Sequence, residues 1–266
     1  MKNVFLYTVT AAFLALSCNA VKMEAPLKYG TLSISLSGES GLDVLTKGEL
    51  SAADAADYNI AVYNNVDCNG SAAYGPCKYS ELGTDPILLQ EGTYYVWAES
   101  CSSDVSQEGN GCVRLEGKSA EGVSVSAGFA AETSVICTVA NAKVTVLFDA
   151  ESLSGKFENN DLTVTLTCAD RDPLTAEYTA GDEVFWFNAD TELTYTVEGT
   201  SALTGEGVEG RGTIDALSAG SHIQLTIKAQ SSQGLLELSS SVVQAVDKNE
   251  NSNINSEFNP YQDKIN

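Results

Sequence analysis

The sequence is poor in basic residues. Only 14 lysines and arginines stand against 36 aspartates and glutamates in 266 residues, which gives a formal net charge of −22. Nucleic-acid binding depends on a concentrated basic surface that neutralises phosphates, so this composition excludes nucleic acid as a partner. Charged residues make up only 19% of the chain, so the acidity reflects a shortage of bases rather than a high charge content.

Histidine and hydrolase motifs are also scarce. His222 is the single histidine, and no Gly-x-Ser-x-Gly sequence occurs. Nucleophilic hydrolysis needs a serine or cysteine that is activated by a neighbouring base, normally histidine. Structural zinc needs clustered Cys and His ligands, and no two cysteines have the short spacing of such a site. We therefore expect a protein that is not an enzyme and that binds no metal or other cofactor.

Long hydrophobic runs are absent. The apolar run from Val4 to Leu16 follows Lys2 and is too short for a membrane-spanning helix, which needs about 20 residues. This length and a preceding basic residue are typical of a secretory signal peptide. We predict that residues 1–17 are a signal peptide.

A cysteine follows the apolar run directly. Leu14-Ala-Leu-Ser-Cys18 resembles a bacterial lipobox, in which the cysteine is acylated after cleavage. The sequence therefore predicts lipidation at Cys18, a tether over residues 18–28, and attachment to the outer membrane of the cell envelope. Exposure at the cell surface is expected, but Lys22-Met-Glu24 is a poor match to the acidic run that sends such lipoproteins there, so an inward-facing position stays open. The alternative is a plain secretory signal in which Cys18 is incidental. Two or more acyl chains would hold the protein stably at a membrane.

Helical periodicity is missing, and alternation of apolar and polar residues dominates. In Thr31-Leu-Ser-Ile-Ser-Leu-Ser37 the apolar side chains share one face, as in a half-buried strand. Many short strands separated by Gly, Asn, Asp and Ser clusters predict an all-β fold made of sandwiches. The remaining predicted strands cover residues 59–63, 87–89, 93–98, 122–126, 133–139, 143–148, 162–167, 183–187, 192–197, 213–217, 223–228 and 235–243.

The sequence contains two similar halves, which indicates an internal repeat. Asn59–Tyr63 corresponds to Leu162–Leu166, and the turn Ser126-Ala-Gly128 corresponds to Ser218-Ala-Gly220. Such a repeat predicts two tandem antiparallel β-sandwiches of the immunoglobulin or transthyretin type. The predicted domains are residues 29–140 and 141–246, followed by a polar C-terminal tail over residues 247–266.

Six cysteines remain if Cys18 carries lipid. Cys68 and Cys77 bracket one loop rich in Gly and Asn, and Cys101 and Cys112 bracket another. An even count in an exported protein suggests disulfides, so we predict the pairs 68–77 and 101–112. Cys137 and Cys168 lie in strands of different halves and are expected to be free thiols.

Aromatic residues make up 8% of the chain and could bind sugar rings. Tyr95 and Trp97 share one face of a predicted strand, but packing in the core is the first interpretation of their position. The same holds for the run Phe185-Trp-Phe187. Tyrosines nearer to loops are better candidates for a sugar-binding surface: Tyr58, Tyr63, Tyr74 and Tyr79.

Several of these segments together resemble a known family. They are Tyr29-Gly-Thr-Leu-Ser-Ile-Ser35, Asp57-Tyr-Asn-Ile-Ala-Val62, Gly92-Thr-Tyr-Tyr-Val-Trp-Ala98, Val123-Ser-Val-Ser-Ala-Gly128 and Cys137-Thr-Val-Ala-Asn-Ala-Lys-Val-Thr-Val146. They resemble the Bacteroides-type lipoproteins known as domain of unknown function 4493. The resemblance covers residues 29–230, and Cys-x-x-x-Asn-Ala-x-Val is its most specific part.

That family is similar to fimbrillins, which are tandem sandwiches exported as lipoproteins. In fimbrillins a trypsin-like protease removes the N-terminal strand, and a strand of the next subunit fills the groove. The resemblance therefore implies that Thr31–Ser37 is a removable strand and that Lys47 is the processing site. Fimbrillins have arginine at that site, so Lys47 departs from their pattern. The implied donor is the segment Leu235–Val243 or the C-terminal tail.

These observations give two functional hypotheses. The first is a structural or adhesive lipoprotein of the envelope, a fimbrillin-like pilus subunit or accessory, with like subunits as partners through strand exchange. The second is a glycan-binding surface lipoprotein that serves carbohydrate uptake. Exposed, coplanar aromatic rings would favour the second hypothesis, whereas a removable edge strand would favour the first.

Overall fold

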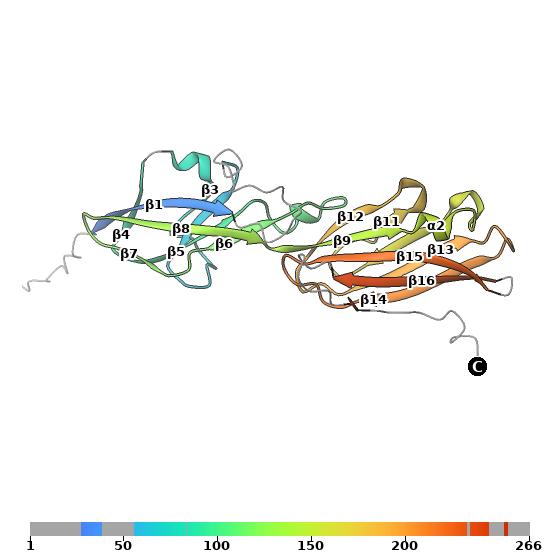
Figure 1. The fold of residues 1–266 in the computed structure, drawn as a ribbon. Helices are drawn as coiled ribbons and strands as arrows, with labels where there is room; N and C mark the ends of the chain where they lie inside the picture. Colours follow the sequence, from blue (N-terminus) through green and yellow to red (C-terminus); the bar gives the residue numbers. More distant parts are fainter. Residues whose placement is uncertain (1–27, 39–55, 84, 233–234, 245–252, 255–266) are drawn as a thin grey trace, which may run out of the picture.

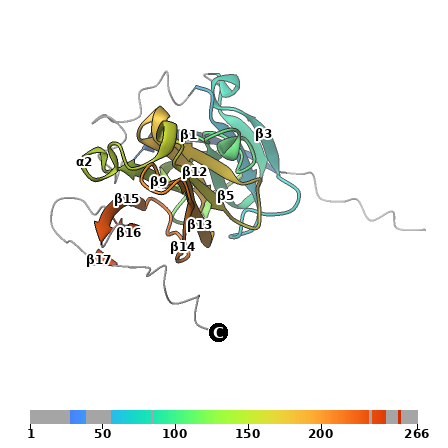
Figure 2. The same ribbon diagram turned by 90° about the vertical axis from the view of Figure 1, so that its right-hand side faces the viewer.

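The computed structural model describes residues 28–38, 56–83, 85–232, 235–244 and 253–254. The predictions for the signal peptide, for Cys18, for Lys47 and for most of the tail lie outside these residues. The described chain forms two β-rich halves that lie end to end (Figure 1). Viewed down the long axis, the C-terminal half covers part of the N-terminal half (Figure 2).

The N-terminal half is one curled, hydrogen-bonded path of strands in the order β3-β2-β5-β6-β8-β1-β4, with β7 paired to β5. Because β6 pairs with both β5 and β8, the path bends round a single core. Its elements are β1 (Tyr29–Gly38), β2 (Asn59–Tyr63), β3 (Tyr74–Lys78), η1 (Tyr79–Leu82), β4 (Ile87–Gln90), β5 (Gly92–Glu99), η2 (Val105–Gln107), β6 (Leu115–Lys118), β7 (Val123–Val125) and β8 (Ala130–Val139).

The C-terminal half is a sandwich of two sheets, with orders β11-β10-β13-β14 and β12-β9-β15-β16-β17. Its one described α-helix begins after Asp149, whose side chain accepts a hydrogen bond from the Ser152 N–H at 3.4 Å. Its elements are β9 (Asn141–Phe148), α2 (Ala150–Leu153), η3 (Glu158–Asn160), β10 (Thr163–Thr167), β11 (Leu174–Glu177), η4 (Tyr178–Ala180), β12 (Glu183–Asn188), β13 (Leu193–Thr200), β14 (Gly207–Ile214), β15 (His222–Ser232), β16 (Leu235–Gln244) and β17 (Asn253–Ile254).

Both halves use the same connectivity. The first strand of each pairs antiparallel with the fourth strand, β1 with β4 and β9 with β12. It also pairs parallel with the strand that follows the Ser-Ala-Gly turn, β1 with β8 and β9 with β15. The sequence repeat is therefore reproduced in the topology. The predicted all-β fold with two tandem sandwiches is confirmed, with one parallel strand pair in each half.

Each half has its own core, built by the alternation of apolar residues along its strands. The first core includes Leu32, Val96 and Val135, and the second includes Val144 and Leu225, all fully buried. Burial of each such side chain stabilises the fold by about 1.5–3 kcal/mol. The two separate cores mean that each half can hold its own sheet together.

The joint between the halves contains no linker. Strand β8 ends at Val139 and β9 begins at Asn141, whose side chain is fully buried. The Asn141 amide N–H donates to the Cys112 carbonyl at 2.8 Å, and its amide oxygen accepts from the Arg114 N–H at 3.0 Å. This one side chain therefore connects the first strand of the C-terminal half to the loop that ends at β6.

The loop that carries η2 crosses the joint. The Trp186 N–H of β12 donates to the Asn110 carbonyl at 2.8 Å. The Arg171 guanidinium donates to the carbonyls of Trp186 and Gly109, and it lies 5.4 Å from the centre of the Phe187 ring. These contacts dock a loop of the N-terminal half on a strand of the C-terminal half, which favours a rod with a stiff joint.

Candidate functional site

All six described cysteines are free thiols in this structure, so neither predicted disulfide is formed. For Cys68 and Cys77 the strand order gives the reason. Cys77 lies on β3, whereas the loop of Cys68 turns toward β6, where the Lys118 ammonium donates to the Val66 carbonyl at 2.9 Å. Strands β2 and β5 lie between these two positions. Cys68 and Cys77 therefore lie at the two ends of one loop in the sequence, but their thiols are not paired in the structure.

Cys101 and Cys112 lie differently. Burial raises the pKa of the Cys112 thiol, and the Cys101 thiol, which is hydrogen-bonded to it, raises that pKa further. The pair lies at the base of the loop that docks on β12. In this structure the two thiols are free but are hydrogen-bonded to each other. A disulfide between them therefore stays a prediction for the exported protein.

The two cysteines that were expected to be free lie in or beside the cores. Cys137 is fully buried in the N-terminal core, and burial together with the nearby Glu116 carboxylate raises its pKa to about 11. Cys168 packs against the C-terminal core. A thiol with so high a pKa is protonated at neutral pH and is a poor nucleophile, so Cys137 has a packing role.

Three aromatic side chains share the outer face of the N-terminal sheet. Register places Tyr63 beside Tyr95 and Ala61 beside Trp97, while Val62 and Val96 point inward to the core. Tyr63, Tyr95 and Trp97 are half-buried, so the expectation that Tyr95 and Trp97 pack in the core is wrong. The strand alternates, and Tyr94 is the residue of this run that points inward.

The other aromatic candidates lie elsewhere. Trp186 is only 9% exposed, and its neighbours Phe185 and Phe187 belong to the C-terminal core. Of the loop tyrosines, Tyr58 is buried, while Tyr74 and Tyr79 pack against the N-terminal core. Tyr63, Tyr95 and Trp97 are called the aromatic row below.

Charged groups lie next to the aromatic row. The Trp97 indole N–H donates to Glu116 at 3.3 Å, and the Arg114 guanidinium pairs with both Glu116 and Glu99. Arg114 also donates to the Cys101 carbonyl at 3.2 Å. One arginine therefore pairs with two neighbouring carboxylates and connects the row to the joint.

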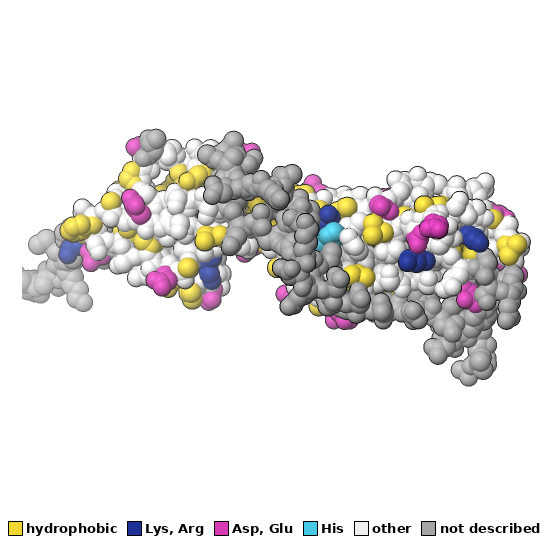
Figure 3. Space-filling view, viewed as in Figure 1, with side chains coloured by type: hydrophobic (Ala, Val, Ile, Leu, Met, Phe, Trp, Pro, Cys, Tyr) yellow, Lys and Arg dark blue, Asp and Glu magenta, His cyan; other side chains and the backbone are white. Residues whose placement is uncertain are grey.

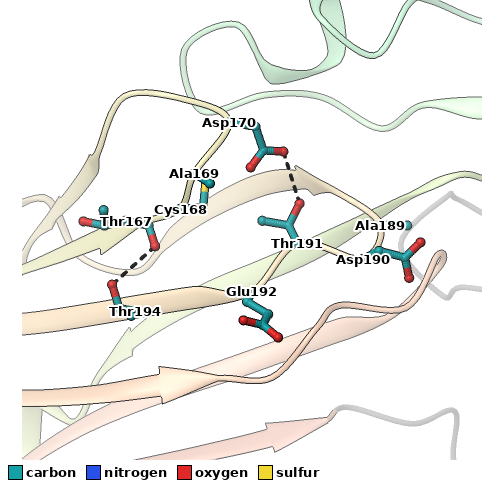
Figure 4. A pocket seen from close by; sticks show the side chains of 9 residues that line it. All are labelled: Thr167, Cys168, Ala169, Asp170, Ala189, Asp190, Thr191, Glu192 and Thr194. Carbon is teal, nitrogen blue, oxygen red and sulfur yellow. Dashed lines mark hydrogen bonds between the residues drawn. The ribbon is translucent and has the colours of Figure 1, made fainter.

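An open depression lies on the C-terminal half between the end of β10 and the turn from β12 to β13. Figure 4 shows Asp170, Asp190 and Glu192 spread round it with their carboxylates pointing apart. The Thr191 hydroxyl donates to Asp170 at 3.5 Å. No group of three or more His, Cys, Asp or Glu side chains that could hold a metal ion occurs in the described part of the chain.

His222 begins β15 and has one polar side-chain partner, the Thr145 hydroxyl, 2.8 Å from its Nε2 atom. Burial lowers the pKa of His222, and the Lys143 ammonium lowers it further. No carboxylate side chain is hydrogen-bonded to the ring among the residues that the structure describes. The arrangement therefore fits a strand residue and not a catalytic base.

The strand that the family resemblance marks as removable lies inside the N-terminal sheet. Strand β1 pairs with β8 over eight positions and with β4 over four, from Tyr29 to Leu32. From Ser33 onward its β4 side has no strand partner among the described residues; the Tyr79 hydroxyl donates to the Ile34 carbonyl there at 3.1 Å. Beyond Gly38, the segment with Lys47 lies outside the described residues.

Sequence reasoning missed Asn141 and Arg114 as individual positions. Asn141 stands in the Cys-x-x-x-Asn-Ala-x-Val segment, which was the most specific part of the resemblance, so a signal for the joint was present. Arg114 stands in a loop with no periodicity, and nothing in the sequence indicates that it reaches two carboxylates.

No helix in the described ranges is long and apolar enough to cross a membrane.

The fold and these surfaces define a rod of two tandem β-sandwiches. A family model with the description "Domain of unknown function (DUF4493)" matches residues 28–256. The chain belongs to this family, which confirms the resemblance found in its sequence. The comparison with curated proteins gave no match.

Solved structures with a similar arrangement share little sequence with this chain. The fimbrial anchor protein Mfa2 from Porphyromonas gingivalis is 13% identical, with a TM-score of 0.47, and the match covers 85% of this chain and 99% of Mfa2. A candidate cell adhesion protein from Bacteroides eggerthii is 12% identical, with a TM-score of 0.45 and coverage of 84% and 99%. A candidate polysaccharide-binding protein from Bacteroides thetaiotaomicron is 12% identical, with a TM-score of 0.42 and coverage of 81% and 95%.

Proposed function

We propose that this protein is a non-enzymatic lipoprotein of the cell envelope, held at the outer membrane by acylated Cys18, with a structural or adhesive role. It acts as a fimbrillin-like subunit or accessory that assembles by β-strand addition. The observation that carries this proposal is the position of β1, which beyond Leu32 has no strand partner on its β4 side among the described residues and which precedes a protease-sensitive type of residue, Lys47.

Loss of β1 would open a groove with two unpaired edges. The β8 edge from Ala130 to Cys137 and the β4 edge would both lose their hydrogen-bonding partner. On the inner face, the pocket of Leu32 in the core would be emptied, and those of the half-buried Ile34 and Leu36 would be exposed. Unpaired sheet edges beside apolar pockets bind an incoming strand with both affinity and specificity.

The net charge of −22 opposes close association of like subunits. Strand addition provides backbone hydrogen bonds and apolar burial that are independent of charge. A partner strand must therefore match the alternation of β1, with apolar residues at every second position. The segment Leu235–Val243 and the tail are the parts of the chain proposed to supply it.

Limited proteolysis tests this assembly. The chain from residue 18 onward is treated with a trypsin-like protease under native conditions. We expect cleavage after Lys47, followed by oligomers that persist in unheated detergent gels. A synthetic peptide with the sequence of residues 29–38 should suppress these oligomers, because it occupies the same groove.

Two variants make the result specific. Lys47→Ala should remain an uncut monomer, whereas Lys28→Ala, which removes the lysine on the other side of β1, should behave as the unmodified chain does. A chain that is cut after Lys47 but remains monomeric contradicts assembly by strand addition. Oligomers formed by the Lys47→Ala variant contradict it as well.

The aromatic row supports a second candidate function, glycan binding at the surface for carbohydrate uptake. Sugar rings stack on aromatic faces, and Tyr63, Tyr95 and Trp97 lie together on an outer sheet face. Lys118, directly opposite Trp97 in the register, and Glu116 provide polar groups at the edge of the row. The proposed ligand is an uncharged oligosaccharide.

A glycan array with the full mature chain tests this candidate. Binding that is lost in Trp97→Ala and in Tyr95→Ser, but kept in Trp186→Phe at the joint, would support a site on the aromatic row. Absence of binding to any neutral oligosaccharide, or equal binding by all three variants, would remove this candidate.

A further inference from the structure

Three large apolar side chains are exposed at the end of the rod that lies away from the joint. Tyr29 at the start of β1 is 42% exposed, Leu88 on β4 is 64% exposed, and Phe129 before β8 is 71% exposed. These three residues are called the apolar tip. In Figure 3, hydrophobic side chains appear at the left-hand end of the molecule next to a basic one.

Backbone hydrogen bonds hold the apolar tip together. The Gly128 N–H donates to the Tyr29 carbonyl at 2.8 Å, and the Thr31 N–H donates to the Phe129 carbonyl at 3.0 Å. Leu88 pairs with Thr31 across the β1–β4 ladder, so it lies diagonally opposite Tyr29 on the outer face. The three side chains are therefore displayed on ordered strands and a tight turn.

The turn before β8 cannot shift far from β1. A Cβ atom at Gly30 would lie 2.2 Å from the Ser126 carbonyl oxygen and 3.0 Å from the Phe129 carbonyl oxygen. Only glycine permits so close an approach of two backbone segments. The backbone at Phe129 is thus held close to β1, and most of its side chain is exposed.

The chain enters the rod at this same end. The Lys28 carbonyl accepts a hydrogen bond from the Glu91 N–H at 2.8 Å. Lys28 lies ten positions after Cys18, and an extended chain spans at most about 3.5 Å per residue, so Lys28 at the tip can lie no more than about 35 Å from the anchor. The apolar tip is the part of the described rod nearest to the predicted acyl chains.

We propose that the apolar tip inserts into the interfacial layer of the phospholipid surface that holds the anchor. The inference rests on the proposed lipidation of Cys18. Phe and Leu favour the apolar side of a bilayer interface, and Tyr and Lys are suited to its polar side. Glu91 and Glu132 near the tip are repelled by anionic headgroups, so the surface it fits is zwitterionic.

This second contact would orient the rod. An anchor at Cys18 alone would be a single point of attachment and would leave the rod free to tilt. Insertion of the tip adds a contact at a small further cost in entropy, because the tether already keeps the tip near the surface. The C-terminal half would then point away from the membrane.

Depth-dependent quenching tests the inference. The full acylated chain is reconstituted in phosphatidylcholine vesicles that contain lipids with nitroxide groups on their acyl chains. A Phe129→Trp variant reports on the tip. Insertion to a depth of about 5–10 Å is typical of interfacial apolar side chains, and we expect the new tryptophan to lose most of its fluorescence. Leu88→Trp provides a second reporter with the same expected loss.

The matched control is Leu203→Trp. Leu203 is also 64% exposed, but it lies in the hairpin between β13 and β14, at the end that points away from the joint. All three reporter variants retain Trp97 and Trp186, so the background signal is the same. The control tryptophan should keep its fluorescence. Equal quenching of the three reporters would overturn the inference.

Two further measurements separate the possible failures. Intact mass reports whether Cys18 is acylated; an unmodified cysteine removes the proposed anchor. An acylated chain whose tip reporters are no more quenched than Leu203→Trp leaves the anchor in place and overturns insertion of the tip. In the Phe129→Trp background, Tyr29→Ser together with Leu88→Ser should restore fluorescence, since the remaining apolar surface is too small.

Discussion

At the residue scale, the Asn141 side chain links the two halves at their joint by hydrogen bonds. Its fully buried side chain satisfies the Cys112 carbonyl and the Arg114 N–H at once. Both of these groups belong to the N-terminal half, while Asn141 begins the first strand of the C-terminal half. A single amide therefore couples two sandwiches that otherwise have separate cores.

Asn141→Ala should lower the free energy of unfolding by about 1–3 kcal/mol, because it leaves a part-buried donor and a part-buried acceptor without partners. Urea unfolding followed by circular dichroism measures the loss. Asn64→Ala, at an exposed position in the turn after β2, should change stability very little. Equal effects of the two variants would show that the Asn141 bonds contribute nothing.

His222 gives the C-terminal half a defined response to acid. Burial and the Lys143 ammonium hold the folded-state pKa of His222 below its ordinary value of 6.5. Between these two pKa values the unfolded chain binds more protons than the folded chain, so stability falls as the pH falls. The contribution of neutral His222 is fully present above pH 6.5 and is lost through the window below it.

His222→Gln should flatten this part of the pH profile. Glutamine can still hydrogen-bond to Thr145 but does not titrate. Urea midpoints of both proteins, measured between pH 8 and pH 5, should diverge because only the unmodified protein loses the His222 contribution below about pH 6.5. Both proteins have the same carboxylates, so parallel profiles over that range would contradict the assigned pKa shift.

At the element scale, the loop with η2 closes over Trp186 of β12. A Cβ atom at Gly111 would lie 2.8 Å from the Trp186 Cβ atom and 2.7 Å from the Ser106 carbonyl oxygen. Gly109 in the same loop has a similar positive φ of 57°, but nothing lies within 4 Å of its Cβ position. The two glycines therefore separate the effect of backbone strain from that of the contact.

Gly111→Ala should release the loop from β12, whereas Gly109→Ala should leave it docked. Both variants carry the penalty for a left-handed alanine, about 1–2 kcal/mol. Only Gly111→Ala should shift the Trp186 emission to longer wavelength, since water then reaches a ring that is 9% exposed in the docked state. Emission spectra that are identical for the two variants would contradict docking of the loop.

Much of the strand pattern could be predicted from the sequence, because alternation of apolar residues marks a half-buried strand. Strands β1, β2 and β5 follow it closely. Strand β14, by contrast, was expected at residues 213–217 and lies at Gly207–Ile214. Its glycines interrupt the apolar alternation that would have predicted it. A Cβ atom at Gly212 would lie 2.2 Å from the Tyr195 hydroxyl, so the Tyr195 ring occupies the space that a side chain would need.

Strands β3, β6 and β11 were missed for related reasons. Strand β3 contains Gly75 and Pro76, which ordinarily indicate a turn. In β6, Gly117 lies so near to β8 that a Cβ atom would be 2.2 Å from the Ile136 carbonyl oxygen. Strand β11 is a four-residue edge strand with too few residues to show a period. Close backbone contacts across sheets are tertiary features that a local pattern does not contain.

At the scale of the whole molecule, the repeat and its tandem order were visible in the sequence, but which faces of the sheets are covered was not. The Ser-Ala-Gly turns and matching strands indicate two similar units. Which faces would be covered depends on the loop with η2 and on β16, and neither has a counterpart in the other half. The aromatic row was misjudged for this reason, because burial of Tyr95 and Trp97 depends on which elements cover β5.

The whole rod carries many acidic groups and a few basic ones, and Figure 3 shows both kinds scattered over the visible face. Several of the basic side chains have acidic partners: Arg114 with Glu99 and Glu116, Arg211 with Glu209, and Lys228 with Asp149 at 3.8 Å. Other basic side chains of the described residues, such as Lys118 on β6 and Lys143 on β9, belong to different strands. The proposed attachment to a membrane therefore relies on lipid and apolar groups.

The central claim is that this acidic rod is a lipoprotein anchored through its first mature residue. Intact mass and N-terminal peptide analysis of the protein from the native envelope test it most directly. We predict a chain that begins at Cys18 and carries the added mass of acyl chains on that residue. A chain that begins at a residue other than Cys18 or, after processing behind Lys47, Gly48, or one that begins at Cys18 with an unmodified mass, would contradict the claim.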